Sequence, residues 1–355
     1  MSDRYYRYGI IGPGRKYGTE GSTGFGMAHS HVTAFYKFHG IELVSIAEVR
    51  EDNARMFTEQ YNPYAKVYTD YREMLANERL DIVSVCTWPA LHADMVVAAC
   101  EAGVKAIHCE KPMATTWGDA KRMKSAADAR HVILTFNHQR RFLECFQCAK
   151  HLIAEGAIGN LRWLEAECGD MSDWGTHWLD MMFFLNNETP AEWVMGQIES
   201  HTGRTGFGVP QEDQAVCHFQ WKNGVRGLLI AGPGSQIGTA FRVIGKDGTL
   251  EISWEMKSVR IRAKGDADWR EIPTNEGVQG DFSIDRACAD LVRGLDEPGY
   301  KPMLTVDHAI QHTEVIFATF ESSRRRGRVT LPLTEDDNAL LALLAAGEIG
   351  PSKNA

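Results

Sequence analysis

The first 136 residues alternate between strand-like and helix-like segments, and this alternation restricts the fold more than any other feature of the chain. The strand-like segments are short apolar runs at 6–11, 41–47, 66–68, 81–86, 104–109 and 132–136. Helical patterns, with apolar residues three to four positions apart, lie at 52–61, 92–102 and 116–129. Strands that alternate with helices pair in parallel, so the pattern predicts an α/β domain in which helices cover both faces of a doubly wound sheet.

The pattern changes near residue 137. A long helix is predicted at 139–154, a strand at 161–167 and a short helix after Asp173. Extended segments then follow at 193–199, 215–221, 227–231, 241–244, 249–254 and 259–263, before helices at 282–293 and 306–324 and a strand at 329–331. Successive hairpins predict an α+β domain with a mostly antiparallel open sheet. The predicted division is therefore 1–136, then 137–335, with a C-terminal helix and tail at 336–355.

The charge balance argues against a nucleic-acid partner. The chain of 355 residues has 38 Lys plus Arg against 47 Asp plus Glu, a net charge of −9. A nucleic-acid binder needs a basic surface that neutralises phosphates. The basic run from Arg324 to Arg328 closes a predicted helix, where cations complement the carbonyl end, so it is predicted to be a solvated helix terminus.

The apolar segments and the cysteine content of the chain indicate in which compartment the protein resides. The residues after Met1 lack the apolar core of a signal peptide, and the apolar stretch at 339–346 is far shorter than a membrane span. Eight cysteines are too sparse for a disulfide framework in a chain of this length. The sequence therefore predicts a cytoplasmic protein with no membrane association.

One cysteine pair has the spacing of a metal or redox site. Cys145 and Cys148 are followed by His151 within the predicted helix at 139–154. Residues at this spacing also share one face of any helix, and no second Cys/His pair follows. We expect no metal.

The loop after the first strand suggests dinucleotide binding. Gly12-Pro13-Gly14 directly follows the apolar run at 6–11, where a Rossmann fold needs residues without Cβ near a pyrophosphate. The next glycine that opens a helix is Gly26, so a nine-residue insertion is inferred within 16–25. Glu48, at the end of the second strand, is 22 residues beyond Gly26, close to the usual offset of the carboxylate that binds the adenosine ribose.

Glu48 also bears on the choice of cofactor. A carboxylate at this position repels the extra phosphate of NADP, so NAD is favoured. Arg15 and Arg50 keep NADP open, because either arginine could instead bind a 2′-phosphate or be a solvated surface residue.

Over nearly its full length the chain resembles the Gfo/Idh/MocA family of sugar and cyclitol oxidoreductases. The motifs that carry the resemblance are Gly9-Ile10-Ile11-Gly12-x-Gly14-Arg15, Gly26-x-x-His29, Tyr68-Thr69-Asp70-Tyr71-x-x-Met74-Leu75, Thr87-x-Pro89-x-x-His92, Glu110-Lys111-Pro112, Arg141-Phe142 and Asp173-x-Gly175-x-His177-x-x-Asp180. The insertion after Arg15 and the presence of Trp88 in the Thr-x-Pro motif depart from the family pattern.

The resemblance implies roles for several residues. The expected cofactor contacts are Gly12, Gly14, Arg15, Glu48, Thr87, His92, Glu110 and Lys111. Lys111 ends the fifth strand, where ligands of open α/β sheets bind, and its ammonium there would stabilise negative charge on the substrate oxygen. The resemblance also suggests that the peptide bond before Pro112 is cis. For His92, the alternative to a cofactor contact is that it caps the helix that follows it.

His177 is the predicted acid/base. Removal of a hydride from an alcohol requires loss of the hydroxyl proton, and imidazole titrates in the right range. Asp173 precedes it by four residues, so on a helix it would orient the ring or bind a substrate hydroxyl. A helix-capping aspartate followed by a core histidine would leave the same pattern.

Three further residues have two interpretations each. Asp180 is either a partner of His177 or a charge on the helix surface. Arg141 either contacts substrate or forms a structural ion pair, and Trp174 either stacks on a sugar or belongs to the core.

The sequence therefore predicts an NAD(P)-dependent dehydrogenase that oxidises a secondary alcohol of a sugar, cyclitol or glycoside. The alternative is an enzyme whose tightly bound NAD is oxidised and reduced within one cycle to cleave or eliminate a glycoside. A non-catalytic dinucleotide sensor would lack Lys111, Asp173 and His177, all of which are present. A homo-oligomer, dimer or tetramer, is expected through the open sheet.

Overall fold

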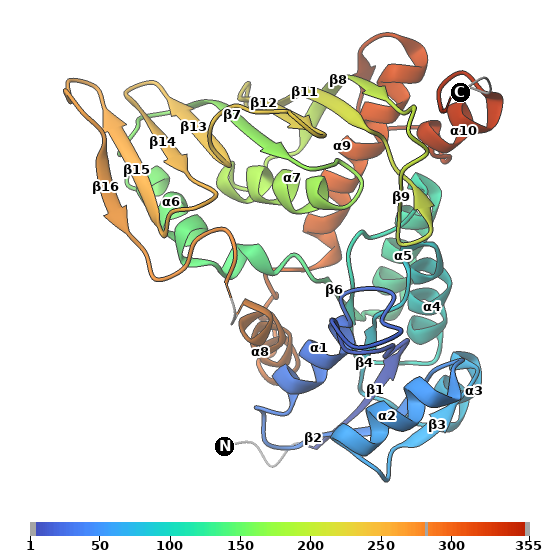
Figure 1. Cartoon of the computed structure of the whole chain (residues 1–355). Coiled ribbons are helices and arrows are strands. Elements are labelled where there is room, and N and C mark those ends of the chain that lie inside the picture. The colour runs from blue at the N-terminus through green and yellow to red at the C-terminus, as the bar shows by residue number, and fades with distance from the viewer. Residues whose placement is uncertain (1–4, 281–282, 352–355) are drawn as a thin grey trace. The chain divides into compact units, whose positions relative to one another are not determined.

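A computed structural model describes residues 5–280 and 283–351 (Figure 1). The chain divides into two compact units. Unit 1 comprises Met1–Thr115, Asp119–Asn137 and Ile284–Ala309, and unit 2 comprises Thr116–Gly118, His138–Ser283 and Ile310–Ala355.

Unit 1 is built on a six-stranded parallel sheet in the order β3-β2-β1-β4-β5-β6. Its strands are β1 (Tyr6–Ile11), β2 (Ile41–Ala47), β3 (Lys66–Tyr68), β4 (Ile82–Val85), β5 (Ala106–Cys109) and β6 (Ile133–Phe136). This order is that of the dinucleotide-binding Rossmann fold, whose ligands lie beyond the carboxyl ends of the strands. The predicted doubly wound domain is confirmed, with strand bounds that differ by at most two residues.

The helices of unit 1 connect these strands, except for α8, which comes much later in the chain. They are α1 (Met27–Phe35), α2 (Glu51–Tyr61), α3 (Tyr71–Asn77), α4 (Pro89–Glu101), α5 (Trp117–Arg130), whose first residues fall in unit 2, and α8 (Ser283–Asp296). Sequence periodicity did not predict the short α3, although Asp70 caps it by accepting a hydrogen bond from the Arg72 N–H at 2.8 Å.

Helix α8 belongs to unit 1, although it comes late in the chain. The predicted boundary placed 284–309 in the second domain, but this segment belongs to unit 1. The reason is packing, because Cys288, Leu291 and Val292 are buried in the same apolar core as Tyr8 and Phe35. The predicted start of this helix at Phe282 lies outside the described residues.

Unit 2 contains a nine-stranded sheet in the order β16-β15-β14-β13-β7-β12-β11-β8-β17. Its strands are β7 (Leu161–Cys168), β8 (Ala191–Glu199), β11 (Gln214–Trp221), β12 (Arg226–Ala231), β13 (Phe241–Gly245), β14 (Gly248–Ile252), β15 (Ser258–Ala263), β16 (Arg270–Pro273) and β17 (Val329–Thr330). Only the β7–β12 pair is parallel, so the mostly antiparallel sheet is confirmed. The edge strand β16 and the short hairpin of β9 (Thr205–Gly206) and β10 (Val209–Pro210) were not predicted.

Helix α7 (Trp174–Leu185) crosses one face of this sheet against β7 and β12, as Figure 1 shows. From Gly175 onward every residue of α7 is buried, so the helix is held firmly against the sheet. Helix α6 (Glu144–Ala154) packs beside it. The other helices are α9 (Val306–Arg325), most of it in unit 2, and α10 (Ala339–Ala346).

One prediction about the helices of unit 2 needs correction. The predicted helix at 139–154 is interrupted, because Gln139–Phe142 forms a 3₁₀ turn and the buried Leu143 is extended, with ψ 137°, before α6 begins. Helix α10, capped by Asn338, forms as predicted and lies in unit 2. No helix among the described residues is long and apolar enough to cross a membrane.

Candidate active site

The glycine loop after β1 has the geometry expected of a close approach to a ligand. Gly12 and Gly14 have φ values of 74° and 60°, which favour glycine. A Cβ on Gly12 would lie 2.3 Å from the Thr87 Cγ2 at the end of β4, so no other residue fits there. Helix α1 begins at Met27, with Gly26 as its N-cap, and residues 15–25 form a loop containing two backbone turns. The insertion inferred from the sequence therefore has no helix or strand.

Glu48 reaches this loop from the end of β2. Its carboxylate accepts hydrogen bonds from the Gly14 N–H and the Arg50 N–H, each at 3.0 Å. Arg15 is bound elsewhere, since its guanidinium pairs with Asp52 and donates to the Asn53 Oδ1 at 2.9 Å. These contacts place the carboxylate, and not the Arg15 guanidinium, beside the glycine loop.

His92, buried in α4, joins the loops that follow β4 and β5. Its Nε2 lies 3.0 Å from the Thr87 carbonyl oxygen and its Nδ1 2.9 Å from the Pro112 carbonyl oxygen. Trp88, not His92, occupies the N-cap position of α4, so His92 does not cap the helix. Burial lowers the pKa of His92, although both carbonyl groups act in the opposite direction. His92 therefore fixes these two loops to each other at the carboxyl edge of the sheet.

Glu110-Lys111-Pro112 follows β5 at that same edge, and the Lys111–Pro112 bond is cis. The Glu110 carboxylate is buried and accepts hydrogen bonds from the Asn137 Nδ2 at 2.7 Å and the His31 Nε2 at 2.9 Å. The Lys111 N–H also donates to it, at 3.3 Å. Burial alone would raise the pKa of Glu110, but the contacts with His31 and Asn137 and the charge of Lys111 lower it to about 2. Glu110 is thus a buried carboxylate that holds the backbone at Lys111.

His31 was not identified from the sequence. The motif match ends at His29, whose Nδ1 lies 3.1 Å from the Tyr61 hydroxyl. His31 is two residues further along α1 and lies between Glu110 and the Ser84 hydroxyl, at 3.1 Å from the latter. Only the fold brings α1, β4 and β5 together here, so no sequence spacing would have revealed this contact.

In unit 2, the first turn of α7 presents the predicted catalytic pair. Asp173 occupies the N-cap position, but its side chain makes no capping hydrogen bond. The cap is Asp170, whose Oδ1 accepts from the Asp173 N–H at 2.6 Å and the Trp174 N–H at 3.1 Å. Burial and the nearby charge of Asp173 raise the pKa of Asp170. Because Asp170 satisfies the helix end, the capping explanation for Asp173 is not supported.

His177 lies one turn into α7 and is buried. Its ring meets the ring of His138 edge to face, with centroids 5.5 Å apart, and His138 in turn meets His312 at 4.4 Å. Neither histidine was identified as a neighbour of His177 from the sequence. Both come from elements distant in the chain, His138 from just before the 3₁₀ turn and His312 from α9.

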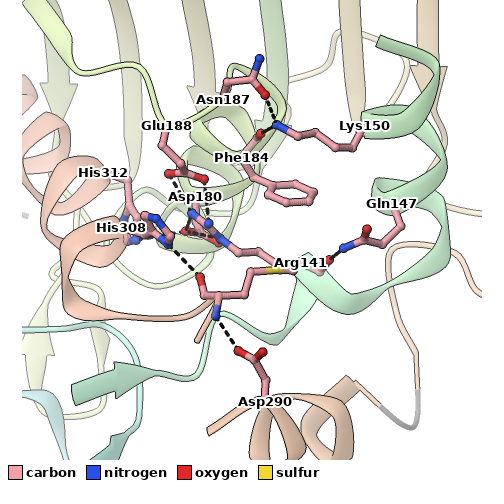
Figure 2. Close-up of polar contacts among 11 residues, drawn as sticks. Arg141, Gln147, Lys150, Asp180, Phe184, Asn187, Glu188, Asp290, His308 and His312 are labelled. Carbon is pink, nitrogen blue, oxygen red and sulfur yellow. Dashed lines mark hydrogen bonds and ion pairs between the residues drawn. The ribbon is translucent and has the colours of Figure 1, made fainter. Parts of the chain in front are cut away.

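Asp180 and Arg141 form a buried ion pair, drawn in Figure 2. The Arg141 Nε donates to both carboxylate oxygens, at 2.9 and 3.1 Å, and Nη2 donates to Oδ1 at 2.6 Å. Glu188 accepts from the Arg141 Nη1 at 2.7 Å. Asp180 is therefore neither a surface charge nor a hydrogen-bond partner of His177, and these contacts support the structural interpretation of Arg141 over substrate binding.

Arg140, the residue before this pair, was not singled out from the sequence. Its guanidinium lies over the rings of Trp174, at 5.3 Å, and Trp178, at 4.9 Å. Trp174 also approaches Trp254, with centroids 6.1 Å apart, and both of these rings are partly exposed. Trp174 therefore joins an aromatic cluster without being fully buried, so both interpretations of this residue remain compatible with its position.

One group of side chains has the composition of a metal site. The ligand atoms of His138, Asp180 and His312 lie within 4.8 Å of one another, a grouping the sequence did not predict. Arg141 already donates to both oxygens of Asp180, so a cation would have to share this carboxylate with a guanidinium. The Cys145 and His151 pattern does not converge on a site, because Cys145 is buried and His151 is 71% exposed and pairs with Glu155.

Comparison with known proteins agrees with this geometry. The model of an oxidoreductase family with an NAD-binding Rossmann fold matches residues 7–138, and the model of the C-terminal α/β domain of that family matches 160–331. An inositol 2-dehydrogenase from Gluconacetobacter diazotrophicus is 30% identical over 300 residues, which cover 78% of this chain and 87% of that protein. A D-apiose dehydrogenase from Paraburkholderia graminis is 23% identical over 356 residues, covering 91% and 92%.

The fold has solved counterparts. The structure of a levoglucosan dehydrogenase in complex with NADH and levoglucosan superposes with a TM-score of 0.76 at 20% sequence identity, and the match covers 93% of this chain and 100% of that one. The chain belongs to the Gfo/Idh/MocA family of oxidoreductases, and NAD is the cofactor of its Rossmann domain.

Proposed function

We propose that this protein is an NAD-dependent dehydrogenase that oxidises a secondary alcohol of a sugar, cyclitol or glycoside, with His177 as acid/base and Lys111 as electrostatic partner. The observation that carries the proposal is the capping of α7 by Asp170. Since the helix end does not use the Asp173 carboxylate as its cap, Asp173 and His177 form one turn of polar groups at the start of α7, while Asp180 further along the helix is bound to Arg141.

The names of the relatives support this substrate class. The similar proteins are called dehydrogenases of inositol, D-apiose and levoglucosan, which are a cyclitol, a sugar and an anhydrosugar. All three carry secondary hydroxyl groups.

The residues of unit 1 fit the cofactor. A Cβ on Gly14 would meet no atom within 4 Å, so the loop is open at this point, and Glu48 stands beside Gly14, where a ribose hydroxyl would be bound. When bound, NAD supplies the acceptor for the hydride that leaves the alcohol carbon. Gly12, Gly14 and Glu48 would hold the dinucleotide, and His92 fixes the adjoining loops.

Side chains of the protein accept the hydroxyl proton and stabilise the charge on the substrate oxygen. A ring nitrogen of His177 accepts the hydroxyl proton as the hydride departs, so that the carbon–oxygen bond becomes a carbonyl. The Lys111 ammonium stabilises the negative charge that develops on that oxygen. Asp173 stabilises the protonated ring or binds a neighbouring hydroxyl, and Glu110 fixes the backbone at Lys111.

The test is a panel of polyols, aldoses, sugar acids and glycosides incubated with the enzyme and NAD, with NADH absorbance as the readout. At least one member with a secondary hydroxyl should be oxidised, with the matching ketone recovered as product. Absence of NADH across the panel, from protein that binds NAD in a calorimetric titration, would contradict the proposal.

A further inference from the structure

Arg140 is a buried cation that forms no ion pair or side-chain hydrogen bond among the described residues. It is 7% exposed, and its Nε is shielded from solvent without a hydrogen-bond partner. Among the described residues its side chain makes no hydrogen bond or ion pair. Its guanidinium makes cation–π contacts with the faces of Trp174 and Trp178. The adjacent Arg141, equally buried, is bound by two carboxylates.

Such a group is costly for a folded protein. A guanidinium removed from water without hydrogen bonds loses much of its solvation free energy, and contact with aromatic faces returns only part of that loss. Burial lowers the pKa of Arg140 to about 10, while the charge of Asp173 acts in the opposite direction. The side chain is therefore still a cation at neutral pH, and its N–H groups remain available to a ligand.

The position of Arg140 connects it with the start of α7. Asp173 is the carboxylate whose charge acts on it, and the other titratable neighbour is the Cys145 thiol, whose pKa burial raises to about 12. The thiol is thus neutral, and the charge that acts on Arg140 within the described part of the chain is that of Asp173. The two tryptophans cover the face of the guanidinium, so a ligand would meet its edge, where the N–H donors point.

We propose that Arg140 binds a carboxylate of the substrate, so that the substrate class is the sugar acids, a uronate or an aldonate. The planar edge of a guanidinium matches both oxygens of a carboxylate, and the pairing supplies the hydrogen bonds that the fold does not. A neutral hydroxyl would occupy one donor and bring no charge to pair with the guanidinium. The inference rests on the proposed function, because it assigns a second group to the same substrate.

The experiment compares acidic and neutral sugars of matched shape. The probes are D-galacturonate with D-galactose, D-glucuronate with D-glucose, and D-gluconate with D-glucitol. Binding to the protein loaded with NADH, which cannot oxidise them, is measured by calorimetry, and NADH formation is measured separately with NAD. The variants are Arg140→Gln, Arg140→Lys and, as a control that removes an exposed arginine from β7, Arg162→Gln.

In the wild type, at least one acid should bind about 10-fold or more tightly than its neutral partner, the scale of a charge-assisted pair. Arg140→Gln should abolish this preference, Arg140→Lys should keep part of it, and Arg162→Gln should keep it all. Melting curves establish that each variant is folded. Equal binding of acids and neutral sugars by the wild type, or a preference that survives in Arg140→Gln, overturns the inference.

The two readouts separate this inference from the proposed function. NADH formed from neutral sugars, with no acid preferred in either assay, contradicts the role of Arg140 and leaves the dehydrogenase proposal intact. Binding of an acid that depends on Arg140 with no oxidation of any compound contradicts the dehydrogenase proposal and leaves the acid-binding role of Arg140 intact.

Discussion

Arg140 and Arg141 are adjacent and both buried, yet only Arg141 is bound by carboxylates. The 3₁₀ turn at Gln139–Phe142 directs one guanidinium to Asp180 and Glu188 and the other to the tryptophans at the start of α7. One arginine is therefore suited to holding the fold together and the other to holding a ligand.

The stability of the ligand-free protein should distinguish these two roles. Arg141→Met removes the partner of the buried Asp180 and should lower the free energy of unfolding by about 3 kcal/mol or more. Arg140→Met removes a buried charge that forms no ion pair or hydrogen bond and keeps the packing volume, so the free energy of unfolding should stay within about 1 kcal/mol of wild type or increase. Urea denaturation monitored by circular dichroism measures both. Equal destabilisation by the two substitutions would show that Arg140 also holds the fold.

Lys111→Met should keep the fold and cofactor binding but lower turnover by about 10²-fold or more, the scale of losing one preorganised charge. The matched control is Lys105→Met, which lies just before β5, at the opposite end of that strand, and pairs with Asp81. Steady-state kinetics with any accepted substrate gives the comparison. Turnover near the wild-type value in Lys111→Met would remove this residue from the mechanism.

Alcohol oxidation should rise with pH through a single ionisation, because only a neutral His177 ring can accept the hydroxyl proton. Asp173→Asn removes a charge that stabilises the protonated ring, so the acidic limb of log kcat/KM should move to lower pH. His177→Asn should abolish that limb together with most activity.

The control for this pH profile is His151→Asn, which changes an exposed histidine on α6. It should leave the profile unchanged. Retention of activity with an unchanged acidic limb in His177→Asn would show that another group accepts the proton. His138, which meets the His177 ring edge to face, would then be the next candidate.

NAD should bind more tightly than NADP, because the Glu48 carboxylate lies beside the glycine loop and would repel a 2′-phosphate. Glu48→Ala should reduce this preference by about tenfold, whereas Glu51→Ala, which removes an exposed carboxylate from α2, should preserve it. Calorimetric titration with both cofactors measures the ratio. Equal or tighter binding of NADP by the wild type would indicate that Arg50 overrides Glu48, since Arg15 is bound to Asp52 and Asn53.

The depressed pKa of Glu110 predicts a loss of stability in acid. Its folded value of about 2 lies below the ordinary 4.5, so the stabilisation is complete above about pH 5 and disappears as the pH falls towards 2. Glu110→Gln should therefore lower the free energy of unfolding by on the order of 3 kcal/mol at pH 7 and by much less at pH 3. Denaturation at both pH values tests this, with the exposed Glu59→Gln as control. An equal loss of unfolding free energy at both pH values would mean that the fold does not stabilise the ionised form of Glu110.

The sequence alone predicted much of the fold and named candidate residues for the cofactor site. The strands of unit 1 are short apolar runs separated by amphipathic helices, and Gly12, Gly14 and Glu48 occur at spacings set by the local geometry of strand, turn and helix. Such patterns depend on neighbouring residues in the chain, so they are visible without the structure.

The tertiary structure decided the pairing of the polar groups. Asp180 binds Arg141 and not His177, Asp170 caps α7, and His31 holds Glu110, because elements distant in the chain meet in the core. Helix α8 joins unit 1 for the same reason, since its apolar face packs with Tyr8 and Phe35. A sequence shows which residues can carry a charge, but burial and long-range packing determine which charges are neutralised within the fold and which, like that of Arg140, are left for a ligand.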